Sequence, residues 1–394
     1  MATLEQNTWT LDQWYAQEYA SATPYTGSHQ LWTWGFNEYG QLGQNKSGNP
    51  SKRSSPVQIP GTSFQSFSYG SYVTTDNELY VWGDAAYGQL GLNKSHPSPS
   101  LYRSSPTQLP GSWSYVNKEA SYAMAVKTDG TLWTWGNGVY GSLGTNTPSN
   151  THRSSPVQVG TDTTWASGYQ KLCASTMGRG AIKTDGTLWV WGDGTYGQFG
   201  ENSSNTQYSS PVQIGTETTW KTYSANYMGI AAIKTDGTLW TWGRNQYGQL
   251  GQNNQNQYES PKQIPGSWSY ATMGYQYMHA TKTDGTLWCW GRNASGALGN
   301  NQTQTSPSGP GLKQKSSPVQ IPGTNWDRPF VCEKNNNGGA IKTDGTLWMW
   351  GSNSQGQIGV NDINQRSSPT QVGTDTNWQK ALVSNETVHG LRLF

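Results

Sequence analysis

The chain has 394 residues, a formal net charge of +2 and only 12% charged residues. Its mean hydropathy of −0.76, with no long apolar run, excludes a transmembrane helix. Lysine and arginine form no cluster of the kind that a nucleic-acid partner normally requires, so we expect no nucleic-acid binding.

The first 27 residues differ from the rest of the chain. Met1–Thr10 has neither a basic nor an apolar segment of the secretory type, so no signal peptide is expected. Thr10 is a suitable N-cap for a short helix that ends near Ala20. Two interpretations of residues 1–27 stay open. The segment is either a strap packed on the main domain or an anchor that docks that domain on a larger assembly.

From Ser28 onward one motif recurs. Leu-Trp-x-Trp-Gly is found six times, and a seventh copy, Leu79–Gly83, has Tyr80 in place of the first tryptophan. Neighbouring copies begin about 48 to 60 residues apart, a period typical of repeat architectures. The six complete copies are Leu31–Gly35, Leu132–Gly136, Leu188–Gly192, Leu239–Gly243, Leu287–Gly291 and Leu347–Gly351.

Each repeat predicts four short strands. An Asp-Gly pair between two apolar runs, such as Asp236-Gly237, predicts a hairpin whose second strand is the Leu-Trp-x-Trp-Gly segment. A Ser-Ser-Pro segment follows as an outer strand, because proline is tolerated at a strand start. A segment that opens with tryptophan, such as Trp220, gives the remaining strand. Four strands per repeat is the blade of a β-propeller.

The ends of the chain predict how the ring closes. The first repeat begins at His29 without its two preceding strands, whereas the last continues through Trp378–Ser384 and Thr387–Leu393. We therefore expect these C-terminal segments to pair with Leu31–Gly35 in a composite blade, which removes two open sheet edges. The predicted fold is all-β, a seven-bladed propeller of four-stranded antiparallel blades over residues 28–394.

These motifs resemble the RCC1 repeat family, the seven-bladed propellers similar to the regulator of chromosome condensation. The motifs that carry the resemblance are Leu-Trp-x-Trp-Gly, Gly-Gln-Leu-Gly (for example Gly40–Gly43) and Ser-Ser-Pro-x-Gln (for example Ser54–Gln58). The resemblance implies protein binding, since the family includes GTPase exchange factors, photoreceptors, enzyme inhibitors and ubiquitin-ligase modules. The family's Gly-x-x-His loop and the photoreceptor's Gly-Trp-Arg-His-Thr segment are absent here, so no exchange or light-sensing residue is carried over.

Catalytic and metal-binding patterns are lacking. The five histidines show no zinc-ligand spacing, and the repeated Lys-Thr-Asp-Gly pairs are interpreted as hairpin tips with solvated charges. Cys173, Cys289 and Cys332 show no paired spacing and are expected to be free thiols, with Cys289 buried. The sequence therefore predicts no enzymatic activity, no metal site and no cofactor.

The loops before the second strand of each repeat are the predicted protein-binding site. They vary between repeats, they should emerge on one face, and they are rich in residue types common at interface hot spots. The alternative is that each tyrosine caps its own blade. The predicted contact residues are Tyr69, Tyr72, Tyr122, Arg179, Tyr227, Tyr275 and Tyr277.

Two further sets of residues are candidates for a functional or packing role. Tyr39, Tyr87, Tyr140, Tyr196 and Tyr247 recur just before a glycine of the Gly-x-Leu/Phe-Gly motif, and this regularity favours a packing role. The variable stretches Gln44–Arg53, Leu92–Arg103 and Asn300–Lys315 are candidate functional loops, because long loops concentrate function or disorder.

Two functions are compatible with these observations. The polar surface, rich in Asn, Gln, Ser and Thr, together with the lack of an export signal favours a structural or recognition protein displayed on a virus or phage particle. Its partner would be a larger particle or a surface receptor. The alternative is a soluble cytoplasmic regulator that binds a GTPase or an enzyme on one face. Both are non-enzymatic protein-binding roles.

Overall fold

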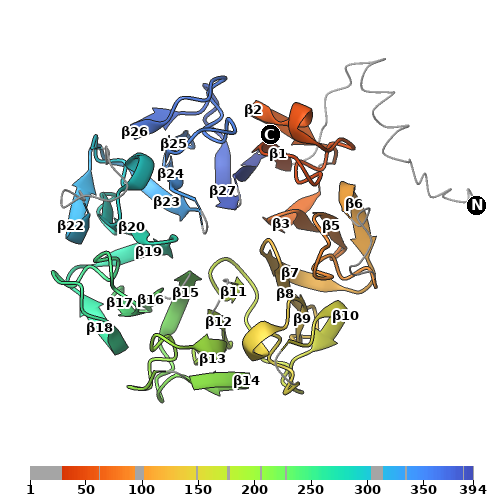
Figure 1. Cartoon of the computed structure of the whole chain (residues 1–394), viewed down its shortest axis with the longest axis vertical. Coiled ribbons are helices and arrows are strands. Elements are labelled where there is room, and N and C mark those ends of the chain that lie inside the picture. The colour runs from red at the N-terminus through yellow and green to blue at the C-terminus, as the bar shows by residue number, and fades with distance from the viewer. Residues whose placement is uncertain are drawn as a thin grey trace, which may run out of the picture.

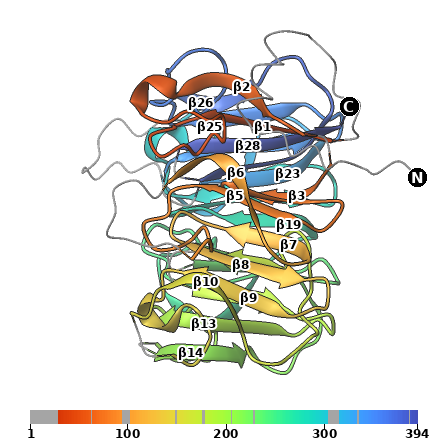
Figure 2. The ribbon, with the colours of Figure 1, turned by 90° about the vertical axis from the view of Figure 1, so that its right-hand side faces the viewer.

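The computed structural model describes residues 29–61, 63–93, 102–147, 150–174, 178–204, 206–226, 229–302, 314–332, 335–384 and 386–393. Its sheets are arranged around a central axis as a disc (Figures 1 and 2). There are seven four-stranded antiparallel sheets, so the predicted seven-bladed propeller is confirmed. The predicted helix within Thr10–Ala20 and the extension over residues 1–27 lie outside the described residues, and their role stays a prediction.

In six blades the strand that opens with an aromatic residue lies nearest the axis, and the Ser-Ser-Pro or Glu-Ser-Pro strand lies at the rim (Figure 1). In the blade that contains Leu188–Gly194 the axial strand is Leu172–Ala174 instead, and the predicted opening residue Trp165 forms an isolated bridge with Lys183. From axis to rim the strands are β3 (Phe64–Ser68), β4 (Ser71–Thr74), β5 (Leu79–Gly83), β6 (Arg103–Leu109); β7 (Trp113–Lys118), β8 (Tyr122–Lys127), β9 (Leu132–Gly136), β10 (Arg153–Gln158); β11 (Leu172–Ala174), β12 (Gly178–Ile182), β13 (Leu188–Gly194), β14 (Thr206–Gln213); β15 (Trp220–Asn226), β16 (Gly229–Lys234), β17 (Leu239–Gly243), β18 (Tyr258–Ile264); β19 (Trp268–Met273), β20 (Tyr277–Lys282), β21 (Leu287–Gly291), β22 (Lys315–Ile321); β23 (Trp326–Val331), β24 (Asn337–Lys342), β25 (Leu347–Gly351), β26 (Arg366–Gln371); and β27 (Trp378–Ser384), β28 (Thr387–Leu393), β1 (His29–Gly35), β2 (Arg53–Ile59). Three 3-10 turns lie in loops, η1 (Asn49–Ser51), η2 (Val139–Gly141) and η3 (Ala294–Gly296).

The last of these sheets is the predicted composite blade. Strand β1 pairs antiparallel with β28 along its whole length, from His29 opposite Leu393 to Gly35 opposite Thr387. Strand β27 then pairs with β28 on the axial side, and β2 pairs with β1 at the rim. The two ends of the chain therefore complete one sheet and leave no gap in the ring (Figure 1).

The second tryptophan of each Leu-Trp-x-Trp-Gly motif joins its blade to the preceding one. The Nε1–H of Trp82, for example, donates to the main-chain oxygen of Gln41 in the Gly-Gln-Leu-Gly loop of the blade before it, at 2.8 Å. Trp34 closes the circle by donating to Gln357 of the last repeat at 3.0 Å. The final glycine of that loop is required, because a Cβ at Gly359 would lie 2.7 Å from the Trp34 Nε1. The two motifs recur together because they form one interface.

The first tryptophan of the motif supports the Asp-Gly hairpin. In one such hairpin, Asp185 accepts hydrogen bonds from the amide and the hydroxyl of Thr187, and Thr187 in turn accepts from the indole of Trp189. Lys183 lies over the Trp189 ring, 3.9 Å from its centroid. The lysine of these tips is therefore stacked on indole rings, and the prediction of fully solvated charges was wrong for it.

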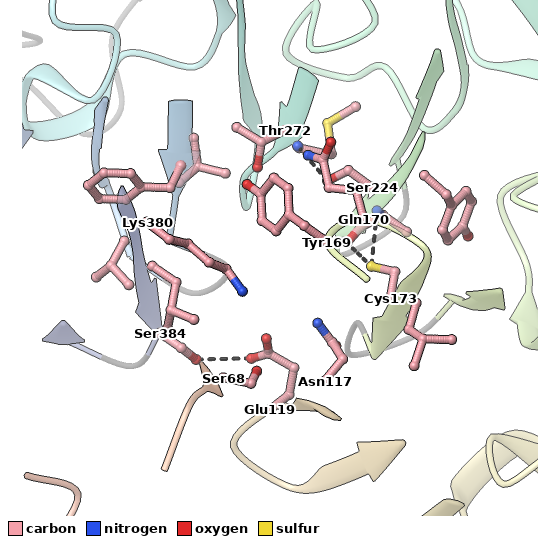
Figure 3. Close-up of a pocket in the computed structure, with 18 of the residues that line it drawn as sticks. Ser68, Asn117, Glu119, Tyr169, Gln170, Cys173, Ser224, Thr272, Lys380 and Ser384 are labelled. Atoms are coloured by element: carbon pink, nitrogen blue, oxygen red, sulfur yellow. Dashed lines mark hydrogen bonds between the residues drawn. The ribbon is translucent and has the colours of Figure 1, made fainter. Parts of the chain in front are cut away.

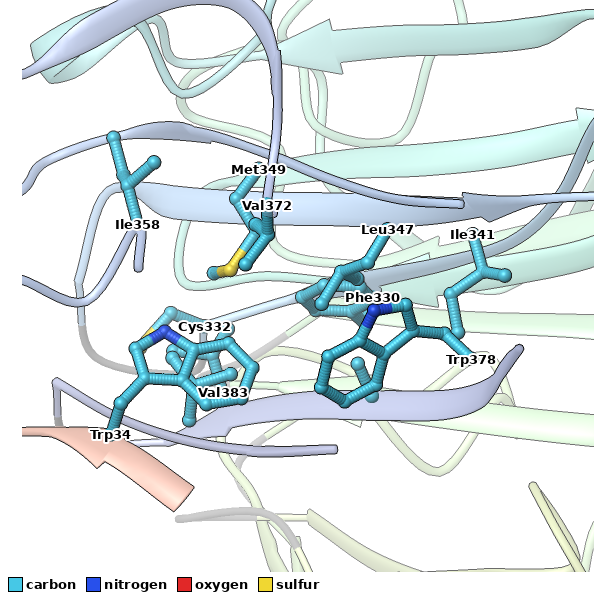
Figure 4. Close-up of a cluster of buried hydrophobic side chains, with 12 residues drawn as sticks. Trp34, Phe330, Cys332, Ile341, Leu347, Met349, Ile358, Val372, Trp378 and Val383 are labelled. Atoms are coloured by element: carbon cyan, nitrogen blue, oxygen red, sulfur yellow. The ribbon is translucent and has the colours of Figure 1, made fainter. Parts of the chain in front are cut away.

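Apolar clusters fill the spaces between the blades. At the junction of the β23–β26 blade with the composite blade, Trp34, Trp378, Phe330 and Met349 pack together with aliphatic neighbours (Figure 4). The rings of Trp34 and Trp378 meet edge to face at 5.9 Å. Both faces of a blade are covered in this way, so large flat side chains are needed at these positions. Cys173, Cys289 and Cys332 are buried free thiols, as predicted.

No helix in the described part of the chain is long and apolar enough to cross a membrane. Within the same residues, no group of three or more His, Cys, Asp or Glu side chains is placed to hold a metal ion.

Candidate functional site

The predicted contact loops lie on one face of the disc. Each loop joins the axial strand of a blade to the next strand, and in six blades the first residue of that next strand pairs with the glycine that ends the Leu-Trp-x-Trp-Gly motif. Tyr122 lies opposite Gly136, and Tyr277 lies opposite Gly291. We call this side of the disc the loop face. The opposite side carries the Asp-Gly hairpins and is called the hairpin face.

The side chains of these loops are buried, contrary to what a contact surface requires. Tyr69, Tyr72, Tyr122, Arg179 and Tyr277 are each at most 8% exposed. They pack between blades because each loop is short and its last residues already belong to the second strand. Their burial matches the alternative role as blade caps, and any direct contact with a partner stays a prediction. Tyr275 is half-buried, and Tyr227 lies outside the described residues.

The contacts of these residues explain their burial. The Tyr122 ring lies under the Arg179 guanidinium of the next blade, 4.5 Å from its carbon. The Tyr277 hydroxyl donates to the main-chain oxygen of Asn337 at 2.7 Å, which again joins two blades. Burial raises the pKa of both hydroxyls above the usual range, so they stay protonated. These side chains therefore set the shape of the loop face from below.

The exposed tyrosines are those for which the sequence favoured packing. Tyr39, Tyr87 and Tyr140 are 41%, 42% and 42% exposed, respectively. Their loops follow β1, β5 and β9 and therefore lie on the loop face. In two of these loops the main-chain amide of the tyrosine donates to a glutamine two residues later, as Tyr39 does to Gln41 at 2.8 Å. The glutamine holds the backbone of these two loops, and the tyrosine side chain remains exposed.

Two tyrosines at equivalent positions are half-buried, each beneath an arginine. Arg244 lies over the ring of Tyr196, and Arg292 lies over that of Tyr247, at 4.6 Å and 5.2 Å from the centroids. Their amides make the same bond to a glutamine two residues on. The tyrosines at this position of the repeat thus differ in their surroundings. Three are exposed, and two lie beneath an arginine.

The open tyrosines belong to a larger exposed group. Among the described residues six large apolar or aromatic side chains are exposed, and all but Leu393 lie in loops that follow β25, β1, β5 or β9. These strands belong to four consecutive blades, so the residues follow one arc of the loop face (Figure 1). We call this group the tyrosine arc: Ile363 (60% exposed), Tyr39, Tyr87, Tyr102 (38% exposed) and Tyr140.

Arginine accompanies the arc in the same four blades. The rim strand begins with Arg366 in β26, Arg53 in β2, Arg103 in β6 and Arg153 in β10. Each of these side chains is half-buried. Only Arg366 forms a salt bridge to a carboxylate in the described part of the chain, with Asp362. The rim strands of the β11–β14 and β15–β18 blades begin instead with Thr206 and Tyr258. The arc therefore combines tyrosine with arginine, two residue types enriched at interface hot spots.

The sequence does contain a signal that separates the two kinds of tyrosine. A glutamine side chain fixes the loop backbone by accepting a hydrogen bond from the tyrosine amide two residues earlier. This bond is found at Tyr39, Tyr87, Tyr196 and Tyr247, and it does not involve the tyrosine ring. The residue that follows the motif glycine in the next repeat then separates the two kinds. It is Arg244 for Tyr196 and Arg292 for Tyr247, but Asp84 for Tyr39 and Asn137 for Tyr87. Only the structure shows that each arginine covers the ring of a neighbouring repeat.

Comparisons with known proteins agree with this architecture. The model of the RCC1-like domain matches residues 72–388, and that of the regulator of chromosome condensation (RCC1) repeat matches residues 28–75. The chain belongs to the RCC1 repeat family. The resemblance seen in the motifs is thereby confirmed, and the matches cover most of the described propeller.

Individual relatives share only part of their length with this chain. The human E3 ubiquitin-protein ligase HERC2 is 29% identical over 154 residues, which are 37% of this chain and 3% of the ligase. The zebrafish protein RCC2 homolog is 30% identical over 145 residues, which are 35% of this chain and 28% of that protein. The chain thus matches less than a third of the length of either relative. The crystal structure of Prp20p from Saccharomyces cerevisiae superposes with a TM-score of 0.77 at 16% identity, covering 95% of this chain and 94% of Prp20p, and shows the same fold.

Proposed function

We propose that this RCC1-family propeller is a non-enzymatic regulator that binds a partner protein through the tyrosine arc. The observation that carries the proposal is the grouping of exposed Tyr39, Tyr87, Tyr140 and Ile363 on four consecutive blades, on one face. Soluble proteins rarely gather exposed large apolar side chains in one region unless it is an interaction site. The buried loop residues, such as Tyr122 and Arg179, support this face by fixing the blades beneath it.

The arginines suggest the chemistry of the partner. Arg53, Arg103 and Arg153 lie beside the arc, and no carboxylate pairs with them in the described part of the chain. A partner with an acidic surface would supply the missing carboxylates, and such charge-assisted contacts add orientation and speed of association. Of the relatives, Prp20p is described as binding Gsp1p and histones, and HERC2 is a ubiquitin ligase. These facts favour a protein partner. A role on a virus or phage particle finds no support among the relatives and is not proposed.

The test compares open and covered tyrosines at equivalent positions of the repeat. The test variant is Tyr39→Ala/Tyr87→Ala/Tyr140→Ala, and the matched control is Tyr196→Ala/Tyr247→Ala. Each is used to capture partners from cells, and the affinity of the captured protein is then measured with purified chains. The arc variant should weaken binding by about 2 to 4 kcal/mol in total, because hot-spot tyrosines dominate interface energies. The control should bind within about fivefold of wild type.

A weaker arc variant with normal thermal unfolding supports the proposal. Equal binding by the arc variant and wild type would show that the partner uses another surface. Capture of several structural proteins of one particle, instead of a single regulated protein, would overturn the regulatory role in favour of a particle component.

A further inference from the structure

Two adjoining spaces lie between the axial strands, and together we call them the axial channel. A cavity of about 110 Å³ lies on the loop-face side, and a second space of about 270 Å³ adjoins it. Four residues border both spaces, namely Phe67, Tyr115, Tyr169 and Lys380. Figure 3 shows the Lys380 side chain extending from its strand into the channel, with Asn117 and Glu119 on the facing wall. Lys380 therefore lies between two solvent-sized spaces and is reached from either.

The repeat does not require lysine at this position. Lys380 follows the opening tryptophan of β27 by two residues, and the same place holds Ser66, Tyr115, Thr222 and Arg328 in other blades. Its Nζ donates to the main-chain oxygen of Phe67 at 3.1 Å. Among the described residues the Lys380 amine makes this one hydrogen bond, so two hydrogens of its charged form would have no acceptor. No carboxylate of the described residues forms a salt bridge with Lys380.

Aromatic rings surround the amine on three sides. Its nitrogen lies 4.7 Å from the centroid of Phe67, 5.0 Å from that of Tyr169 and 5.5 Å from that of Tyr115. The charged and titratable groups that face it are Arg328 on β23, Tyr115 and Glu119 from the β7 segment, and Tyr169 before β11. Glu119 already accepts a hydrogen bond from the Ser384 hydroxyl at 2.9 Å. Burial, and then the positive charge of Arg328, lower the pKa of Lys380 to about 7.

The channel also contains an acceptor without a donor. Gln170 is 8% exposed, and its Nε2 donates to the main-chain oxygen of Ala271 at 2.6 Å. Its Oε1 is buried and has no hydrogen-bond partner among the described residues, although Gln170 lines the same 110 Å³ cavity as Lys380. A buried acceptor costs free energy unless a donor satisfies it. The cavity is thus suited to a small molecule that brings a hydroxyl group.

We propose that Lys380 is a covalent capture site for small hydroxyaldehydes that enter the axial channel. The nitrogen lone pair of the neutral amine attacks the carbonyl carbon, a C–N bond forms, and the carbonyl oxygen takes up a proton. The resulting carbinolamine loses its hydroxyl group as water together with the remaining nitrogen proton, which leaves an imine. Amine plus aldehyde gives imine plus water, so neither an oxidant nor a reductant is needed. The aromatic walls of Phe67, Tyr115 and Tyr169 flank the planar product.

Lys118 provides an internal control. Burial also lowers its pKa, to about 8, and its Nζ donates to the main-chain oxygen of Tyr69 at 3.2 Å. The side chain is fully buried and borders neither of the two spaces. The two amines therefore share a lowered pKa but differ in access. Lys221, which is exposed on the surface, is the solvated reference.

The experiment treats the full-length chain with glycolaldehyde and sodium cyanoborohydride at pH 7, and peptide mass spectrometry locates the trapped amines. Lys380 should be labelled at least about tenfold faster than Lys221, because the cavity holds the aldehyde beside the Lys380 amine and the lowered pKa of Lys380 leaves much of that amine neutral at pH 7. Lys118 should stay unlabelled. The labelling rate at Lys380 should level off above about pH 7 to 8.

Two variants complete the test. Lys380→Arg keeps a cation in the channel and should abolish rapid labelling at residue 380. Lys380→Met replaces it as the test variant if the arginine variant has a lowered melting temperature. The proposal is supported if Lys380 of the wild-type chain is labelled faster than both Lys118 and Lys221. Labelling of Lys380 no faster than Lys221 would overturn it, as would labelling that requires denaturant. Because the readout is a chemical modification in the channel, its outcome is independent of partner binding at the tyrosine arc.

Discussion

The composite blade and the β19–β22 blade have the same four-stranded sheet but are held together differently. In the β19–β22 blade the Asp284-Gly285 turn connects the two middle strands, and Lys282 stacks on Trp268 and Trp288. In the composite blade the middle strands β28 and β1 come from opposite ends of the chain. Arg392 takes the place of the lysine, with its guanidinium over Trp32 and Trp378.

The arginine does more than stack. Its guanidinium also donates to Asp375 at 2.7 Å and to the side-chain oxygen of Asn377 at 3.1 Å. A planar fork of donors forms several bonds at once, which a lysine does not. The composite blade lacks a turn between its middle strands. It is held instead by the full-length pairing of β1 with β28, by aromatic packing and by the contacts of Arg392, which we call the arginine clamp. The comparison teaches that ring closure rests on side chains and register rather than on chain connectivity.

The largest expected effect comes from removing the composite blade's C-terminal strands. Deletion of Trp378–Phe394 takes away β27 and β28, exposes the edge of β1 and uncovers Trp34. We expect loss of cooperative unfolding and aggregation, measured by calorimetry and by light scattering. A truncated chain that stays monomeric with an unchanged melting temperature would show that the ring does not need this blade.

A histidine pair offers a second comparison between the same two blades. His389 in β28 and His279 in β20 occupy equivalent positions and are fully buried. His389 Nε2 accepts from the Gly70 amide at 3.3 Å, whereas His279 Nε2 faces the main-chain oxygen of Ala297 at 3.1 Å. Both rings are thus held by main-chain groups, and neither of these contacts supplies a charged partner.

Acid should test both histidines. Burial, joined in His389 by the nearby Lys118 charge, lowers each pKa to about 3. A histidine whose pKa is lower in the folded than in the unfolded protein binds its proton at a higher pH when the chain is unfolded, so acid favours the unfolded state. Its contribution to stability is therefore full above about pH 6.5 and is lost as the pH falls toward about 3. Each histidine should contribute on the order of 5 kcal/mol to this loss.

The measurement is the free energy of unfolding against pH for wild type, His279→Gln and His389→Gln. Glutamine can supply either a donor or an acceptor and does not titrate in this range. Each variant should show a shallower fall between pH 6.5 and 3, by a similar amount in both blades. A change confined to His389→Gln would mean that acid opens the ring at the composite blade alone.

The fold followed from the sequence because its signals are repeated. Seven copies of one motif, five Asp-Gly hairpins and a first repeat lacking two strands specify blade number, strand order and closure, and the structure has all three. The candidate surface did not follow, because exposure changes within one or two residues of a loop. Tyr122 is the first residue of β8 and is buried, whereas Tyr140 in η2 has a positive φ of 60° and is exposed. Lys380 gave no sequence signal either, since its importance depends on a channel formed by all of the axial strands.

The smallest expected effect concerns the clamp itself. Arg392→Ala removes stacking on two indoles and the bonds to Asp375 and Asn377, and should lower the free energy of unfolding by about 2 kcal/mol. Lys282→Ala in the β19–β22 blade removes only stacking beneath a covalent turn, and should cost about 1 kcal/mol or less.

Arg392→Lys sharpens this last comparison. It restores a cation over Trp32 and Trp378 but loses the fork of donors, so its stability in urea unfolding should lie between that of wild type and Arg392→Ala. If Arg392→Ala and Lys282→Ala lose equal stability, the clamp adds nothing at the closure. The ladder between β1 and β28 would then be sufficient to replace the missing turn, because the remaining contacts of the two blades are of the same kind.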